Sequence, residues 1–168
     1  MNKQKIVAGL ASVAMASTLV ACSSNSSSSN AKTLTVSVNQ SLTGQFTPQY
    51  VSSAYDKYVV NLCYQQLLKY DADNELQPEL AKEMPEVSED GQTITFKLNK
   101  GVKFSDGNEL TSKDVKFTFT SLADPKYTGP NGDAALKIEG AKEYMSGEAK
   151  EVSGIETPDK YTVVFHLT

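Results

Sequence analysis

The 168-residue sequence contains no arginine and no tryptophan, and it has only one histidine and two cysteines. All 16 basic side chains are therefore lysines, and 20 acidic residues outnumber them, which gives a formal net charge of −4. Proteins that bind nucleic acids depend on arginine for phosphate and guanine contacts and carry positive charge on the binding face. The composition therefore excludes a nucleic-acid-binding function.

Sequence motifs of catalysis are also missing. The chain has no CxxC, HExxH or GxSxG motif and no glycine loop of the kind that cradles phosphate. Cys63 has no second thiol or histidine near it in the sequence and is expected to be a small buried side chain of a helix. His166 has no acidic or thiol partner nearby in the sequence and is expected to be structural. We therefore expect a protein that is not an enzyme and that has no metal site and no cofactor.

The first 21 residues have the pattern of a secretory signal peptide. Lys3 and Lys5 form a positively charged start, and Ile6–Ala21 follows without a charge. A positive start, an apolar stretch and small residues before the cleavage site define such a peptide. The apolar stretch has 16 residues, fewer than the roughly 18–20 that a permanent membrane helix needs. Residues 1–21 are therefore predicted to be removed on secretion.

The end of this segment, Leu19-Val20-Ala21-Cys22, resembles the lipobox of bacterial lipoproteins. The resemblance implies that Cys22 receives a diacylglycerol, becomes the mature N-terminus and anchors the protein to the outer face of the cell membrane. Residues 22–32 are rich in serine and asparagine, which predicts a flexible tether. The alternative is an ordinary signal peptide with an incidental cysteine. Cleavage would leave 147 residues with 14 lysines and 20 acidic residues, enough for one domain with a core.

Residues 33–168 predict a domain of the α+β class. Alternating apolar residues indicate strands at Thr33–Asn39 and Thr93–Leu98, and Asp90-Gly91 indicates a hairpin turn before the second of these. Two further strands, Val152–Ile155 and Tyr161–Leu167, would flank a turn that contains a proline. Because strands and helices do not alternate strictly, a plain βαβ repeat is excluded.

Helical periodicity is clearest at Val51–Leu68 and at Val115–Leu122. Thr111 and Asp114 fit a capping arrangement at the start of the second of these helices. Ala134–Gly147 is expected to form one or two short helices. On the first helix, one face of mainly apolar residues would carry Val51, Tyr55, Tyr58, Val59, Leu62 and Gln66.

A family resemblance is carried mainly by LAKEMPEVSEDGQTITFKLNKGVKFSDGNELTSKDVKFTF, residues Leu80–Phe119. The stretch combines an acidic-Gly turn, a T-x-T-F-x-L strand, a G-V-K-F-x-D-G turn and an L-T-x-x-D-V helix start. It is similar to the signature of extracellular solute-binding protein family 5, the peptide-binding lipoproteins and periplasmic proteins of ABC importers. Asn99-Lys100 departs from the pattern, since an arginine is usual there, and the usual tryptophan is absent. Supporting segments in the expected order are Phe46–Gln49, Leu67–Asp71 and Asp159–Val163.

The resemblance implies part of the N-terminal lobe of a two-lobe, type II periplasmic-binding-protein-like fold with the extra accessory subdomain. Members of the family are much longer than this chain, so residues 33–168 are expected to be a partial lobe, with the second lobe missing. That lobe supplies the acidic residue that captures the amino terminus of the peptide, so this residue is not assigned here. We expect such a fragment to bind peptide weakly, because a closing cleft buries its ligand from two sides.

The implied function is capture of oligopeptides for import, with the permease subunits of an ABC transporter as partners. The family's ligand pairs with backbone groups as an added strand. The matching segments are Tyr50–Ala54 and Tyr127–Asn131, in which Tyr50 and Tyr127 could equally be plain surface residues. Tyr55 and Tyr58 are expected to belong to the core. Alternative functions are an adhesin, a peptide-pheromone sensor, or a receptor for a nickel chelate, haem or a sugar. The candidate ligand-binding residues are Tyr50, Val51, Ser52, Ser53, Ala54, Tyr127 and Asn131.

Overall fold

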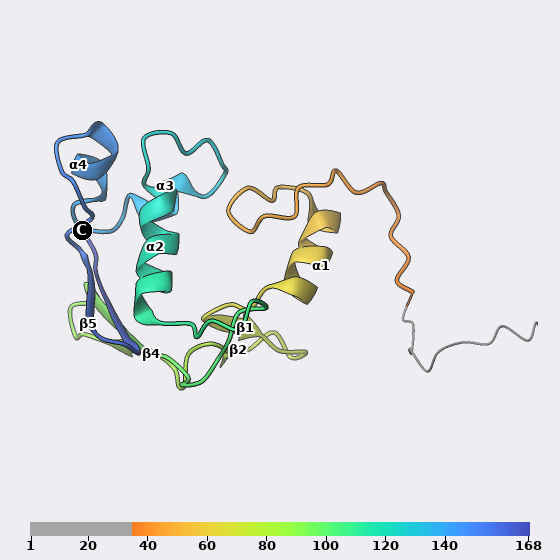
Figure 1. Cartoon of the computed structure of the whole chain (residues 1–168), viewed down its shortest axis with the longest axis horizontal. Coiled ribbons are helices and arrows are strands. Elements are labelled where there is room, and N and C mark those ends of the chain that lie inside the picture. The colour runs from red at the N-terminus through yellow and green to blue at the C-terminus, as the bar shows by residue number, and fades with distance from the viewer. Residues whose placement is uncertain (1–34) are drawn as a thin grey trace, which may run out of the picture. The chain divides into compact units, whose positions relative to one another are not determined.

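Residues 35–168 are described in the computed structural model (Figure 1), and Val38–Thr168 form one compact unit. The predicted signal peptide, Cys22 and the tether lie outside the described residues. The helices are α1 (Ala54–Cys63), α2 (Ser112–Leu122), α3 (Gly132–Ala135) and α4 (Ala141–Ser146). The strands are β1 (Leu68–Tyr70), β2 (Leu76–Pro78), β3 (Glu86–Val87), β4 (Thr93–Lys97), β5 (Ile155–Asp159) and β6 (Thr162–His166). None of the helices in the described residues is long and apolar enough to cross a membrane.

The strands form two antiparallel sheets. β1 and β2 make a separate hairpin, and the larger sheet has the order β3-β4-β6-β5. β4 and β6 are paired along their whole length, from Thr93 opposite His166 to Lys97 opposite Thr162. The central pair therefore joins segments that lie far apart in the chain.

The core lies where α2 packs against β5 and β6. Phe165 of β6 makes edge-to-face contacts with Phe119 of α2 and Phe96 of β4, at centroid distances of 4.7 and 6.0 Å. Val163 and Ile155 are also buried on this face. Burial of a side chain of this size contributes about 1.5–3 kcal/mol, so these residues fix α2 on the sheet.

Several predicted elements are confirmed where their signals are local. The Asp90-Gly91 turn joins β3 to β4, and Gly91 has a φ of +72°, a conformation that glycine adopts without strain. α2 begins with a capping box, in which the amide of Thr111 donates to the Asp114 carboxylate at 2.7 Å. The one or two short helices predicted within Ala134–Gly147 are two, α3 and α4, and α3 begins two residues earlier than predicted, at Gly132.

The predicted strand Thr33–Asn39 is wrong for the residues that the structure describes. Residues 35–39 are not in a strand. A strand exists only where a neighbouring strand completes its backbone hydrogen bonds, and no backbone hydrogen bond to residues 35–39 is found within the described part of the chain.

The predicted helix Val51–Leu68 is too long at both ends. α1 spans only Ala54–Cys63, and Tyr64 has already left the helix with φ −122° and ψ 142°. The chain continues as an extended segment because Leu67 and Leu68 join the β1–β2 hairpin, where the Leu67 carbonyl accepts the amides of Glu79 and Ala81. Tertiary pairing therefore overrides the helical pattern.

The prediction of which face of α1 is buried is also wrong. Asp56 and Val60 are buried, whereas Tyr58 and Leu62 are 55% and 79% exposed. Tyr58 is therefore not a core residue, while Tyr55 is half-buried. The reason is that α1 turns its Asp56 side toward the preceding loop.

The second predicted hairpin exists, but its turn lies later than expected. β5 includes Thr157 and Pro158, and the turn falls at Lys160-Tyr161. Proline is tolerated there because β5 is an edge strand and its pairing with β6 is irregular between Glu156 and Asp159.

Candidate functional site

The candidate wall consists of the two segments predicted from the sequence, Tyr50–Ala54 and Tyr127–Asn131. The first follows a turn in which the Thr47 carbonyl accepts the amides of Tyr50 and Val51, both at 3.0 Å. Near its end, Ser53 is the N-cap of α1, and its hydroxyl accepts the amide of Tyr55 at 3.2 Å. A turn on one side and a helix cap on the other thus fix this short segment.

The second segment follows α2. The Tyr127 amide donates to the Asp124 carbonyl at 2.9 Å, which closes a turn after the helix. The sequence then runs Gly129-Pro130-Asn131 before α3 begins. Proline has no amide, so this part of the loop cannot form a regular ladder.

The structure brings the two segments together at the carbonyl of Gln49. The Tyr127 hydroxyl donates to this oxygen, and the Asn131 side-chain amide donates to it at 3.4 Å. The rings of Tyr50 and Tyr127 are 5.2 Å apart between centroids, at an interplanar angle of 47°. The two segments of the candidate wall therefore lie side by side (Figure 1).

Close packing at Gly129 allows this contact. An ideal Cβ at Gly129 would lie 2.5 Å from Cζ of Tyr127 and 2.8 Å from the Gln49 carbonyl oxygen. Real Cβ atoms essentially never approach other atoms so closely. Only a residue without a Cβ permits the ring of Tyr127 to reach Gln49.

The predicted residues of the first segment differ in what they can offer a ligand. Val51 is 6% exposed and so belongs to the interior, whereas Tyr50, Ser52 and Ala54 are exposed. The amides of Tyr50 and Val51 are already used in the turn. Within the described residues, the amides of Ser52 and Ser53 have no hydrogen-bond partner. Before α1 begins, the free amides of this segment are therefore those of Ser52 and Ser53.

In the second segment, Tyr127 is half-buried and Asn131 is exposed. The hydroxyl of Tyr127 is occupied by Gln49 and by the amide of Asn131, which donates to it at 3.3 Å. Only the ring of Tyr127 remains for a ligand. Gln49 was not recognised from the sequence as part of this site, because a carbonyl acceptor leaves no motif. Gly129 lies within the predicted segment Tyr127–Asn131, but the steric requirement for glycine there was not foreseen.

A hollow of about 850 Å³ adjoins the candidate wall. Gln49, Val51 and Asn131 contribute to its lining. Much of the rest comes from α1, α2 and the strands, including Val60, Phe96, Val115 and Phe119. The wall therefore borders a largely apolar depression.

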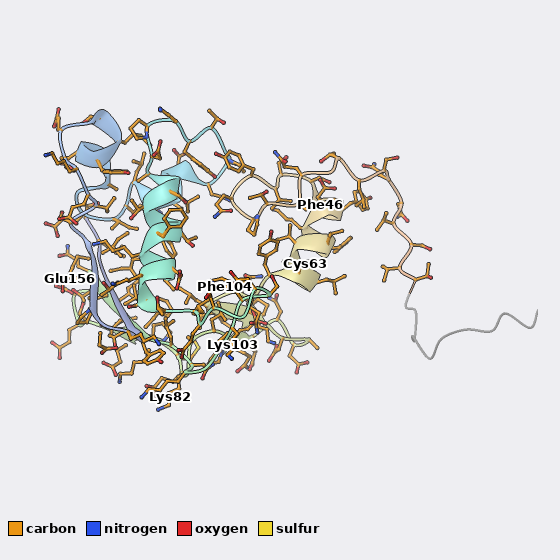
Figure 2. The ribbon with its side chains drawn as sticks, in the orientation of Figure 1. Phe46, Cys63, Lys82, Lys103, Phe104 and Glu156 are labelled. Carbon is orange, nitrogen blue, oxygen red and sulfur yellow. The ribbon has the colours of Figure 1, made fainter. Side chains whose placement is uncertain are left out.

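Cys63, at the end of α1 (Figure 2), and His166, at the end of β6, are not part of the wall. Cys63, expected to be buried, is exposed at the end of α1, because the helix ends there and the chain turns away. His166, which has no acidic partner nearby in the sequence, has its Nε2 atom 3.5 Å from the Glu156 carboxylate and its Nδ1 atom 3.3 Å from the Thr93 hydroxyl. Strand pairing brings these partners together, and nothing in the local sequence indicates it. Within residues 35–168, no group of histidine, cysteine and acidic side chains is arranged to hold a metal ion.

Comparisons with known proteins agree with the predicted family. Residues 75–168 match the family described as bacterial extracellular solute-binding proteins, family 5 Middle. An oligopeptide-binding protein OppA of Lactococcus lactis subsp. cremoris is 39% identical over 74 residues, which cover 44% of this chain and 12% of that protein.

Solved structures that share the fold of this chain include two peptide-binding proteins. The crystal structure of Haemophilus influenzae OppA in complex with RPPGFSPFR has a TM-score of 0.66 and 31% identity, covering 73% of this chain and 24% of that one. The peptide-binding pheromone receptor PrgZ has a TM-score of 0.67 and 27% identity, with the same coverage of 73% and 24%. The chain thus spans about a quarter, or less, of the length of these relatives. The predicted α+β fold, a lobe of an OppA-like binding protein, is confirmed over the matched part.

Proposed function

Because the chain belongs to family 5 of the bacterial extracellular solute-binding proteins, we propose that it is part of a substrate-binding protein that captures oligopeptides for an ABC importer. The named relatives support this proposal: one is an oligopeptide-binding protein, and another was crystallised with a nonapeptide. The permease subunits of the importer are the proposed partners.

The observation that carries the proposal is the candidate wall. The amides of Ser52 and Ser53 are free to pair with an extended ligand, and the rings of Tyr50 and Tyr127 contact each other in the same wall. An extended peptide offers backbone carbonyls at every residue, whatever its sequence. Tyrosine rings accept side chains of varied chemistry, because each has an apolar face. The wall therefore suits a peptide ligand whose sequence varies.

The chain around this wall is proposed to have three parts. Residues 1–21 are a signal peptide, residues 22–32 are a tether that begins with the lipidated Cys22, and residues 33–168 are a partial N-terminal lobe. Lipidation at Cys22 would hold the protein at the outer face of the cell membrane, close to the permease. One acyl chain gives only reversible binding, whereas the two chains of a diacylglycerol anchor firmly.

A second function is supported by the similarity to the pheromone receptor PrgZ. A sensor of a single peptide signal would use the same wall but would need selectivity. Affinities measured against a set of unrelated peptides separate the two functions: a general importer binds many of them at similar strength, and a sensor binds one.

The experiment that tests the wall compares Ser53→Pro with Ser53→Ala in the complete binding protein to which this chain is proposed to belong. Ser53 has φ −73°, which is compatible with the φ of about −65° that proline requires. Both changes remove the hydroxyl that caps α1, at a cost of about 1 kcal/mol in stability. Only proline also removes the amide.

Ser53→Pro is expected to weaken peptide binding by about 1–3 kcal/mol, since a carbonyl of the ligand loses its donor. Ser53→Ala is expected to bind like the wild type. Isothermal titration calorimetry with RPPGFSPFR and a pool of random nonapeptides provides the measurement. Equal affinities of the two variants, with both shown to be folded, would exclude Ser53 from the ligand-binding wall.

A further inference from the structure

Asp56 carries a buried carboxylate that the candidate wall does not use directly. Its side chain is fully buried in the first turn of α1. The carboxylate accepts the amides of Thr43 and Gln45, each at 2.9 Å, and also the hydroxyl of Thr43. A buried charge is tolerated only where such donors replace water. The hydroxyl of Thr43 lowers the pKa of Asp56, burial opposes this, and the amides of Gln45 and Thr43 add to the lowering.

These bonds close a loop. Thr43 and Asp56 are 13 positions apart, and all of Tyr50–Ala54 lies between them. Gly44 has a φ of +85°, a conformation available to glycine, and the amides on either side of it reach the same carboxylate. Loops of this length whose ends meet form compact units on protein surfaces.

The closed loop is held at a second point by the bond from Tyr127 to Gln49. The two attachments differ in kind. Tyr127 ties the middle of the loop to the segment after α2, whereas Asp56 ties the beginning of the loop to its own end. Within the described residues, the bonds to Asp56 are the hydrogen bonds that hold the chain before Gln49 to α1.

We infer that Asp56 is a positioning residue of the candidate wall, which closes the loop Thr43–Asp56 and thereby holds the amides of Ser52 and Ser53 ready for a ligand. The inference rests on the proposed function, because it concerns the same wall. A segment that is ordered before binding spares the ligand the cost of ordering it. If the segment is in the competent form only part of the time, the apparent affinity falls by that fraction.

The chain offers a matched control in Asp71. Its carboxylate also accepts two backbone amides, those of Asp73 at 3.0 Å and Glu75 at 2.9 Å, together with the side-chain amide of Gln77 at 2.9 Å. It closes the turn between β1 and β2, which contributes no residue to the wall. Asp56→Asn and Asp71→Asn therefore weaken similar hydrogen-bond sets at two different places.

Two measurements test the inference. Hydrogen exchange of residues 41–54 in the 168-residue chain reports the order of the loop. Calorimetry with RPPGFSPFR and random nonapeptides, on the complete binding protein to which this chain is proposed to belong, reports the affinity for peptide. Asp56→Asn is expected to accelerate exchange in residues 41–54 and to weaken binding about tenfold, whereas Asp71→Asn changes neither. Thr43→Val is expected to act in the same direction as Asp56→Asn, and Thr43→Ser, which keeps the hydroxyl, to restore wild-type behaviour.

The outcomes distinguish a failure of the inference about Asp56 from a failure of the proposed function. The inference is overturned if Asp56→Asn leaves the exchange of residues 41–54 unchanged, or if it binds peptide as tightly as Asp71→Asn. A wild-type protein that binds none of the peptides refutes the proposed function instead. In that case, exchange alone decides whether Asp56 holds the loop, and faster exchange confined to residues 41–54 supports it.

Discussion

Replacing Gly129 with alanine should separate the two segments of the candidate wall. The new Cβ would lie 2.5 Å from Cζ of Tyr127 and 2.8 Å from the carbonyl oxygen of Gln49. The second of these atoms belongs to the backbone, so rotation of a side chain cannot relieve the clash. Either the loop after α2 or the turn before Tyr50 must move, and the hydrogen bond between Tyr127 and Gln49 is lost.

The expected loss follows from the contacts that hold the segments together. The hydrogen bond from Tyr127 to Gln49 contributes about 1 kcal/mol. The pair of Tyr50 and Tyr127, with ring centroids 5.2 Å apart, contributes about 0.5–1.5 kcal/mol more. Gly129→Ala should therefore lower the free energy of unfolding by about 2 kcal/mol, and peptide affinity should fall with the separation of the wall.

Gly132→Ala is the matched control, because it adds the same methyl group three positions away. Its Cβ would lie 3.4 and 3.5 Å from ring atoms of the same Tyr127, which is ordinary contact. Gly132 is in α3, where alanine stabilises by about 0.4–1 kcal/mol through the unfolded state. Urea unfolding followed by circular dichroism, and calorimetry with nonapeptides, supply the two measurements. The reasoning is refuted if Gly129→Ala is as stable as Gly132→Ala and binds peptide equally well.

Two further predictions concern the carboxylate of Glu109 and the N-terminal segment. Glu109 accepts Lys160 at 2.6 Å and Tyr161 at 2.7 Å, and the bond from Lys160 foremost lowers the pKa of Glu109 from 4.5 to about 2. Because the folded pKa is the lower one, this stabilisation is present above about pH 4.5 and is lost as the pH falls toward 2. Glu109→Gln should therefore flatten the acid dependence of urea unfolding between pH 5 and pH 2.5, and an unchanged dependence would contradict it. Cys22→Ser should release the protein from washed membranes, and retention after an alkaline wash would rule out lipidation at Cys22.

The sequence by itself determined the elements whose signals lie within a few residues. Asp90-Gly91 specifies the β3–β4 turn because glycine alone adopts its positive φ freely. Thr111 and Asp114 specify the start of α2 because the reciprocal capping bonds span only three positions. The family was also readable from the chain, since the matching motifs in Leu80–Phe119 are contiguous and occur in order.

The first helix shows where local patterns fail. Its periodicity continues through Leu67 and Leu68, but these residues gain more from pairing with β2 and packing on the core than from prolonging the helix. The same pattern placed Tyr58 and Leu62 inside, although Asp56 and Val60 are the buried residues of α1. A carboxylate is buried here only because Thr43 and Gln45 donate hydrogen bonds to it. The helical periodicity of the sequence does not show that these donors are present.

For the candidate wall too, the sequence determined one part and the tertiary structure another. Its two segments were predicted from the resemblance, and their binding of peptide stays a prediction. The tertiary structure alone decided that they meet, because the hydrogen bond from Tyr127 to Gln49 joins positions 78 residues apart. It also decided which groups remain free for a ligand: the turn at Thr47 uses the amides of Tyr50 and Val51 and leaves the next two unpaired. Hydrogen bonds between distant segments form only when the packed core brings those segments together. The order of residues along the chain does not show which distant segments the core will bring into contact.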